Sequence, residues 1–146
     1  MSPTLRNIAA VIAGLLVGAV VNGGLISLSP FIIAPPAGVD VTDTESLRAS
    51  IHLFHPRHFV MPFLAHALGT LIGALVAFSV AASHHTRWAW LKGATYLVGG
   101  ILAATMIPAP TWFIALDLIA AYLPMAWLAI LLGRAARGES APVSPA

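Results

Sequence analysis

Two ionisable residues interrupt long apolar stretches of the sequence, and their types suit proton chemistry. Asp117 is the only carboxylate within any such stretch, and His66 lies in another. A carboxylate near the centre of a bilayer costs about 2.5 to 3.5 kcal/mol on insertion scales, so it faces the protein interior and acquires a partner. A histidine and an aspartate can hold one proton between them and exchange it. We therefore predict that His66 is the partner of Asp117.

Further polar residues extend this pair into a predicted layer. Asn22, His66 and Asp117 each lie about 8 to 10 Å below the outer end of their predicted helix, at about 1.5 Å per residue. Each also follows or precedes small residues on the same helical face, which places it toward other helices. Thr70 comes one helical turn after His66. The sequence predicts a ligand-binding layer of Asn22, His66, Thr70 and Asp117 that opens to the outer side.

Three functions are compatible with such a layer. The protein binds or transports a small solute, an ion or a lipid, or it is a membrane enzyme in which His66 and Asp117 transfer protons on a lipid-like substrate. Alternatively, the layer fixes helix register in a structural or accessory subunit of a membrane complex. Because the sequence has no phosphate-binding glycine loop and no nucleophile elbow, binding is favoured over catalysis.

Three histidines in the first loop form a separate candidate site. His52, His55 and His58 are spaced so that the first two would share a helical face. Imidazoles are common ligands of zinc and copper, but this spacing matches no established zinc signature. The alternative is that these side chains lie at the level of the lipid head groups and bind no metal. The favoured expectation is therefore no cofactor, with zinc or copper at these histidines as the alternative.

The composition identifies the elements that must position these residues. Of 146 residues, 59% are hydrophobic and 8% are charged, whereas soluble domains carry about 25% charged residues. Four stretches are each long enough to cross a hydrocarbon core of about 30 Å. The predicted fold is all-α, a single-domain integral membrane four-helix bundle over residues 1–137 with a flexible cytoplasmic tail at 138–146. Its predicted spans are residues 8–28, 59–82, 88–107 and 112–133.

The distribution of basic residues predicts the orientation. Lysine and arginine concentrate in cytoplasmic loops of membrane proteins. One side of the predicted bundle carries only Arg48 and Arg57, whereas the other carries Arg6, Arg87, Lys92, Arg134 and Arg137. Both termini of a multi-pass protein are therefore predicted to be cytoplasmic.

The first outer loop is predicted to contain a short amphipathic helix at residues 43–54. Thr42 followed by Glu45 matches a capping box. Leu47, Ile51 and Phe54 recur at helical spacing. This apolar face would lie on the membrane surface or cap the bundle.

Composition also limits the partners. The chain has no cysteine, and its seven lysine and arginine residues are dispersed over several loops. Nucleic acid is therefore excluded, because its recognition needs a clustered basic surface. Membrane lipids are expected partners. Pairs such as Gly14 with Gly18 and Gly69 with Gly73 pack helices within one chain or drive a homo-oligomer.

Three stretches resemble a known group of sequences. They are residues 52–59 (HLFHPRHF), 62–70 (PFLAHALGT) and 107–113 (IPAPTWF). They are similar to stretches in a family of small, uncharacterised four-span bacterial membrane proteins. The resemblance covers nearly the whole chain and implies the four-span fold and a bacterial inner-membrane location. It implies no activity.

Overall fold

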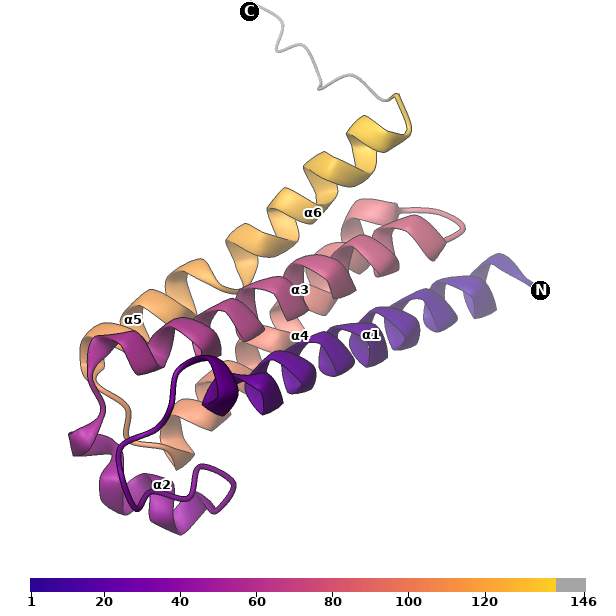
Figure 1. The fold of residues 1–146 in the computed structure, drawn as a ribbon. Coiled ribbons are helices and arrows are strands. Elements are labelled where there is room, and N and C mark those ends of the chain that lie inside the picture. Colours follow the sequence, from indigo (N-terminus) through magenta and orange to yellow (C-terminus); the bar gives the residue numbers. More distant parts are fainter. Residues whose placement is uncertain (139–146) are drawn as a thin grey trace, which may run out of the picture.

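The computed structural model describes residues 1–138, and this part of the chain contains helices and no strands. The predicted all-α class is therefore confirmed, and the predicted tail from residue 139 onward lies outside the described residues. Figure 1 shows α1, α3, α4 and the α5–α6 pair side by side. We call one end of this bundle the α2 end, and we call the other, where α1 begins and α6 ends, the terminal end. In chain order the elements are α1 (Pro3–Ile32), α2 (Thr44–Ser50), the 3-10 turns η1 (Ile51–Leu53) and η2 (Pro56–Phe59), α3 (Val60–Val80), α4 (His85–Met106), α5 (Thr111–Ala120) and α6 (Leu123–Ala136).

Three helical stretches of the described chain are long and apolar enough to cross a membrane. They are Pro3–Ile32, Pro56–Val80 and Thr111–Ala136. The predicted third span, residues 88–107, corresponds to α4, which does not belong to this group. Its first turns carry Arg87 and Lys92, which lower its mean hydropathy.

The helices α1 and α3 pack through glycine. A Cβ atom built on Gly14 would lie 2.5 Å from the carbonyl oxygen of Gly73, and one built on Gly18 would lie 2.6 Å from that of Gly69. Only glycine permits such an approach of two backbones. The predicted small-residue faces of these two helices are therefore occupied within one chain.

The first helix is longer than predicted at both ends. It begins at Pro3, where the side chain of Ser2 accepts a hydrogen bond from the N–H of Leu5. Proline suits the first helical turn because its missing N–H would have no partner there. At the other end the helix continues past the predicted end at residue 28, through Pro30, to Ile32.

The extension at the start of α1 buries a polar side chain that sequence reasoning missed. Asn7 is buried, and its Oδ1 accepts hydrogen bonds from the backbone N–H groups of Ala82 at 2.8 Å and Ser83 at 3.3 Å. Its Nδ2 donates to Ser83 Oγ at 3.1 Å. Asn7 therefore ties α1 to the connection between α3 and α4.

The predicted fourth span is two helices rather than one. The helix α5 ends at Ala120 and α6 begins at Leu123, and Tyr122 between them has φ −117° and ψ −80°. Pro124 explains the break, because a proline ring clashes with the carbonyl of the residue four positions earlier, here Ala120. The break turns the side chain of Tyr122 toward Asp117.

The segment between α1 and α3 contains a helix that is shorter than predicted. Asp43 caps it by accepting hydrogen bonds from the N–H groups of Glu45 and Ser46, so the predicted capping box of Thr42 is wrong. The hydroxyl of Thr42 instead donates to Asp40 Oδ1 at 2.6 Å, and this bond lowers the pKa of Asp40. After Ser50 the chain continues as a 3-10 turn. The helix α2 lies across one end of the bundle (Figure 1).

Candidate functional site

The structure pairs His66 with Asp117, as the sequence predicts. The helix α3 supplies His66 and α5 supplies Asp117, and His66 Nδ1 lies 2.9 Å from each of the two carboxylate oxygens. Tyr122, at the break after α5, donates its hydroxyl hydrogen to Asp117 Oδ2 at 3.0 Å. The rings of His66 and Tyr122 stack, with centroids 5.9 Å apart and an interplanar angle of 27°. Three side chains from three segments therefore form one hydrogen-bonded group.

The hydrogen bonds define the roles of the two histidine nitrogens. When Asp117 is ionised, its carboxylate only accepts hydrogen bonds, so His66 Nδ1 then donates its proton toward Asp117. The side chain of Asp117 is 8% exposed, whereas that of His66 is 22% exposed. In the neutral imidazole Nε2 then bears a lone pair. The group therefore offers a hydrogen-bond acceptor, or a base, at Nε2.

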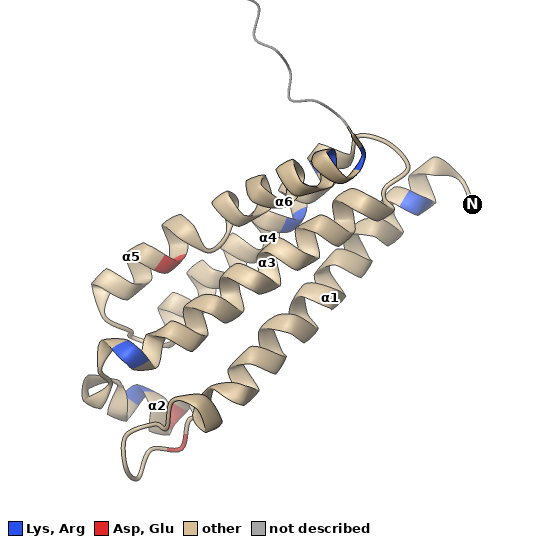
Figure 2. Cartoon of the chain, turned by 45° about the horizontal axis from the view of Figure 1, so that its top comes forward, with Lys and Arg blue, Asp and Glu red and all other residues tan. Residues whose placement is uncertain are grey.

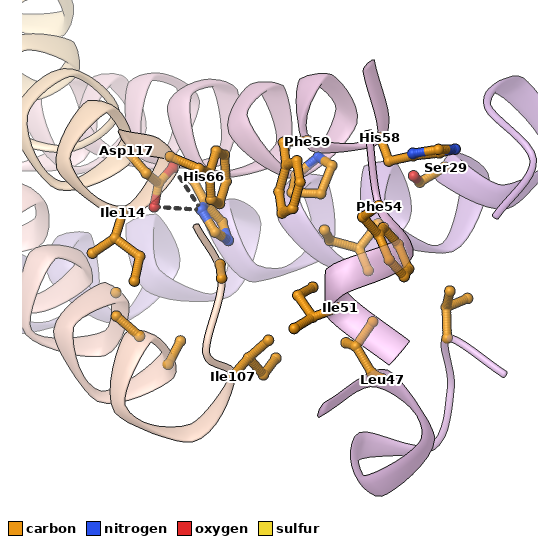
Figure 3. A pocket seen from close by; sticks show the side chains of 18 of the residues that line it. Ser29, Leu47, Ile51, Phe54, His58, Phe59, His66, Ile107, Ile114 and Asp117 are labelled. Atoms are coloured by element: carbon orange, nitrogen blue, oxygen red, sulfur yellow. Dashed lines mark hydrogen bonds and ion pairs between the residues drawn. The ribbon is translucent and has the colours of Figure 1, made fainter. Parts of the chain in front are cut away.

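His66 and Asp117 lie at the wall of a cavity of about 340 Å³ at the α2 end. Most of the lining is apolar, as Figure 3 shows for Phe59, Ile107 and Ile114 around His66. At the α2 end, α1 and α4 contribute aliphatic side chains, a serine and small residues, and α5 closes another side. The segment before α3 covers the cavity with Leu47, Ile51 and Phe54. The predicted apolar face of the loop helix therefore covers this cavity.

The other two residues of the predicted layer lie outside this cavity lining. Thr70 is fully buried, and its Oγ1 has no hydrogen-bond partner in the part of the chain that the structure describes. Asn22 packs near Gly69, where its Cβ would lie 3.0 Å from a Cβ added to that glycine. The structure therefore brings together His66 and Asp117, and it adds Tyr122 in place of Asn22 and Thr70.

Sequence reasoning also missed the buried cation. Lys92 is predicted as a charge on the cytoplasmic flank, but its relative exposure is 0%. Its Nζ donates to the carbonyl oxygens of Gly69 at 2.7 Å and Thr70 at 3.3 Å. It also lies 3.2 Å from the ring centroid of Tyr96, close enough for a cation–π interaction. The prediction fails because α4 begins at His85, which carries Lys92 about two turns into the bundle.

The three loop histidines are the metal site that the sequence offers as an alternative. Within residues 1–138, no group of three histidine or acidic side chains is arranged to hold a metal ion. His58 is buried, its Nδ1 accepts a hydrogen bond from the N–H of His55 at 2.9 Å, and its ring packs edge-on against Phe54. His58 therefore supports the covering segment of the cavity.

Comparisons of the chain with models of known protein families, with curated proteins and with solved structures find no significant match. The resemblance of residues 52–59, 62–70 and 107–113 to four-span bacterial proteins therefore stays a prediction.

Proposed function

We propose that this chain is a four-span protein of the bacterial inner membrane with both termini in the cytoplasm. Three apolar helical stretches of sufficient length support this proposal. The fourth span would be α4, whose more deeply placed charged group, Lys92, is shielded from lipid within the bundle. The two described ends, at the start of α1 and after α6, lie at one end of the bundle, as an even number of spans requires (Figure 1). The cavity would then face the outer side.

The proposed activity is the binding of a small amphiphile in this cavity. The observation that carries it is an apolar cavity of about 340 Å³ with a His66 and Asp117 pair in its wall. This volume falls near the lower limit of small-molecule sites, which are lined by apolar groups with a few placed polar ones. Because His66 Nε2 is an acceptor, the ligand would be an aliphatic body with one donor group such as a hydroxyl. Transport of that ligand would need an oligomer, since four spans are few for a transporter.

Proton transfer by His66 is the second candidate function. Asp117 bonds to Nδ1 and leaves Nε2 on the cavity side, the arrangement by which a carboxylate orients a histidine as a general base. Tyr122 holds the same carboxylate and so fixes its position. A bound molecule with an acidic C–H or O–H against Nε2 would be the substrate, and turnover would separate this function from binding alone.

The test is mass spectrometry of the protein purified in a mild uncharged detergent, with everything retained identified. Wild type would be compared with Asp117→Asn, which removes the charge behind His66, and with Ala104→Phe, which fills the cavity. The matched control for filling is Ala94→Phe, on the exposed face of the same helix. We expect one small amphiphile with wild type and Ala94→Phe, and at least about tenfold less of it with Ala104→Phe, a change of about 1.4 kcal/mol in affinity.

Two outcomes would contradict the proposal. One is a wild-type protein that is folded and retains no specific small molecule from a bacterial membrane extract. The other is a retained molecule whose amount is the same in Ala104→Phe and Ala94→Phe, because that molecule would bind outside the cavity. Chemical conversion of the retained molecule by wild type but not by His66→Gln would favour the enzyme, and unconverted release would favour binding.

A further inference from the structure

A second hollow lies at the terminal end of the bundle, away from the cavity of His66. It has a volume of about 390 Å³ and is formed where α3 ends, α4 begins and α6 ends. Its lining is Phe78, His84, His85, Thr86, Arg87 and Arg134. No step in the proposed function uses these residues.

Among residues 1–138, the arginines of this hollow have no acidic neighbour. Arg87 comes from α4 and Arg134 from α6, and Arg134 Nη2 donates to Thr86 Oγ1 at 3.3 Å. The carboxylates of residues 1–138 are at the α2 end or on α5, namely Asp40, Asp43, Glu45 and Asp117. Figure 2 shows basic residues, and no acidic residue among those described, at the terminal end. The positive charge in the hollow is therefore not neutralised within the described chain.

A third arginine contacts one of the lining residues, His85. Arg137 donates to His85 Nε2 at 2.9 Å, and His85 Nδ1 lies 2.7 Å from the carbonyl oxygen of Phe78. A carbonyl oxygen only accepts, so Nδ1 carries the proton, and Nε2 accepts from an arginine and carries none. Both ring nitrogens of His85 are therefore engaged, and the ring holds Arg137 beside the hollow.

The start of α4 adds to the same field. His84 precedes the helix in the left-handed region, with φ 51°, and its side chain makes no capping hydrogen bond. The first turn of α4 contains no acidic residue. The unpaired N–H groups at a helix start carry partial positive charge and favour an anion. Here these N–H groups add to the positive charge that Arg87 and Arg134 bring to the hollow.

We infer that this hollow binds a phosphate group. Arginine suits it because the planar guanidinium forms paired hydrogen bonds with phosphate oxygens, and Thr86 and the start of α4 supply further donors. The phosphate would belong to an anionic phospholipid of the inner leaflet or to a soluble phosphate compound. This inference is independent of the ligand in the His66 cavity.

The test is titration of the purified protein, in an uncharged detergent, with phosphatidylglycerol, with phosphatidylcholine and with inorganic phosphate. The hollow variant is Arg87→Gln with Arg134→Gln. The matched control is Arg48→Gln with Arg57→Gln, which removes the same charge at the α2 end. We expect the hollow variant to bind phosphatidylglycerol or phosphate about tenfold or more weakly than wild type, and the control to stay within about twofold.

A second variant separates binding from folding. His84→Asp keeps every arginine, and aspartate tolerates the left-handed region and is favoured near a helix start. We expect it to weaken phosphate binding about tenfold while the thermal midpoint stays the same or rises.

The outcomes also identify the source of the phosphate. Binding of phosphatidylglycerol that inorganic phosphate does not displace supports a lipid, and binding of inorganic phosphate alone supports a soluble compound. Equal weakening in the hollow and control variants would overturn the inference, because the effect would then be general electrostatics. Wild type that binds none of the three probes would also overturn it.

Discussion

The ammonium of Lys92 ends on the backbone of the neighbouring helix, at 2.7 Å from the carbonyl oxygen of Gly69. The absence of a side chain at Gly73 makes room for it, since a Cβ there would collide with the end of the lysine side chain. The stem of Lys92 therefore fills a gap between α3 and α4 as a hydrophobic residue would.

The first prediction separates the volume of Lys92 from its charge. Lys92→Met keeps most of the volume and removes a buried cation that no carboxylate of residues 1–138 neutralises. The free energy of unfolding should therefore change by less than about 1 kcal/mol or rise. Lys92→Ala should lower it by about 2 to 4 kcal/mol, because it leaves a cavity. Unfolding by detergent titration, followed by circular dichroism, measures both. Equal losses in the two variants would mean that the charge itself stabilises the bundle.

The second prediction concerns the contact of α1 with α3. Gly14→Ala adds a Cβ that would lie 2.5 Å from a backbone oxygen of α3, so the helices must separate, at a cost of about 1 to 3 kcal/mol in unfolding free energy. Gly23→Ala is the matched control on the same helix, where an added Cβ meets nothing within 4 Å. It should be neutral or stabilising by up to about 1 kcal/mol. The same unfolding titration decides, and similar losses in both variants would refute the close contact.

The third prediction compares two asparagines of α1. Asn7→Ala leaves backbone N–H groups of Ala82 and Ser83 without their partner, which should lower the free energy of unfolding by about 1 to 3 kcal/mol. The side chain of Asn22 makes no hydrogen bond to the rest of residues 1–138. Asn22→Ala should therefore change stability by less than about 0.5 kcal/mol. A larger loss for Asn22→Ala would restore that residue to the polar layer.

The fourth prediction concerns the protonation of His66. With neutral imidazole, nitrogen-15 chemical shifts should identify the proton on Nδ1, because the carboxylate of Asp117 accepts it. Tyr122→Phe removes one bond to Asp117 Oδ2, so it should keep this tautomer and cost about 0.5 to 1.5 kcal/mol in stability. A proton found on Nε2 in wild type would contradict the assigned acceptor and the proposed class of ligand.

The pairing of His66 with Asp117 was predictable because the sequence contains one carboxylate within its apolar stretches and a histidine at matching depth. Their contact needs only that both helices face inward. The role of Tyr122 was not predicted, because a continuous helix would carry its side chain to a deeper level. Pro124 was the signal available for the break.

The position of Lys92 could not be read from hydropathy. A basic residue near the start of an apolar stretch has the same pattern whether it lies at the membrane surface or one or two turns inside. The depth of Lys92 depends on where the helix begins. Because His84 lies in the left-handed region, α4 begins at His85, three residues before the predicted span. Element boundaries depend on such local conformations, which composition does not specify.

The segment before α3 that covers the cavity should influence how long a bound molecule stays there. Leu47, Ile51 and Phe54 touch the cavity, yet α2 itself has no buried residue. A segment with so little buried surface separates from the bundle at small cost, and such local opening precedes global unfolding. We therefore expect the residence time of a bound molecule to depend on how often this segment lifts, while the helices beneath it keep their arrangement.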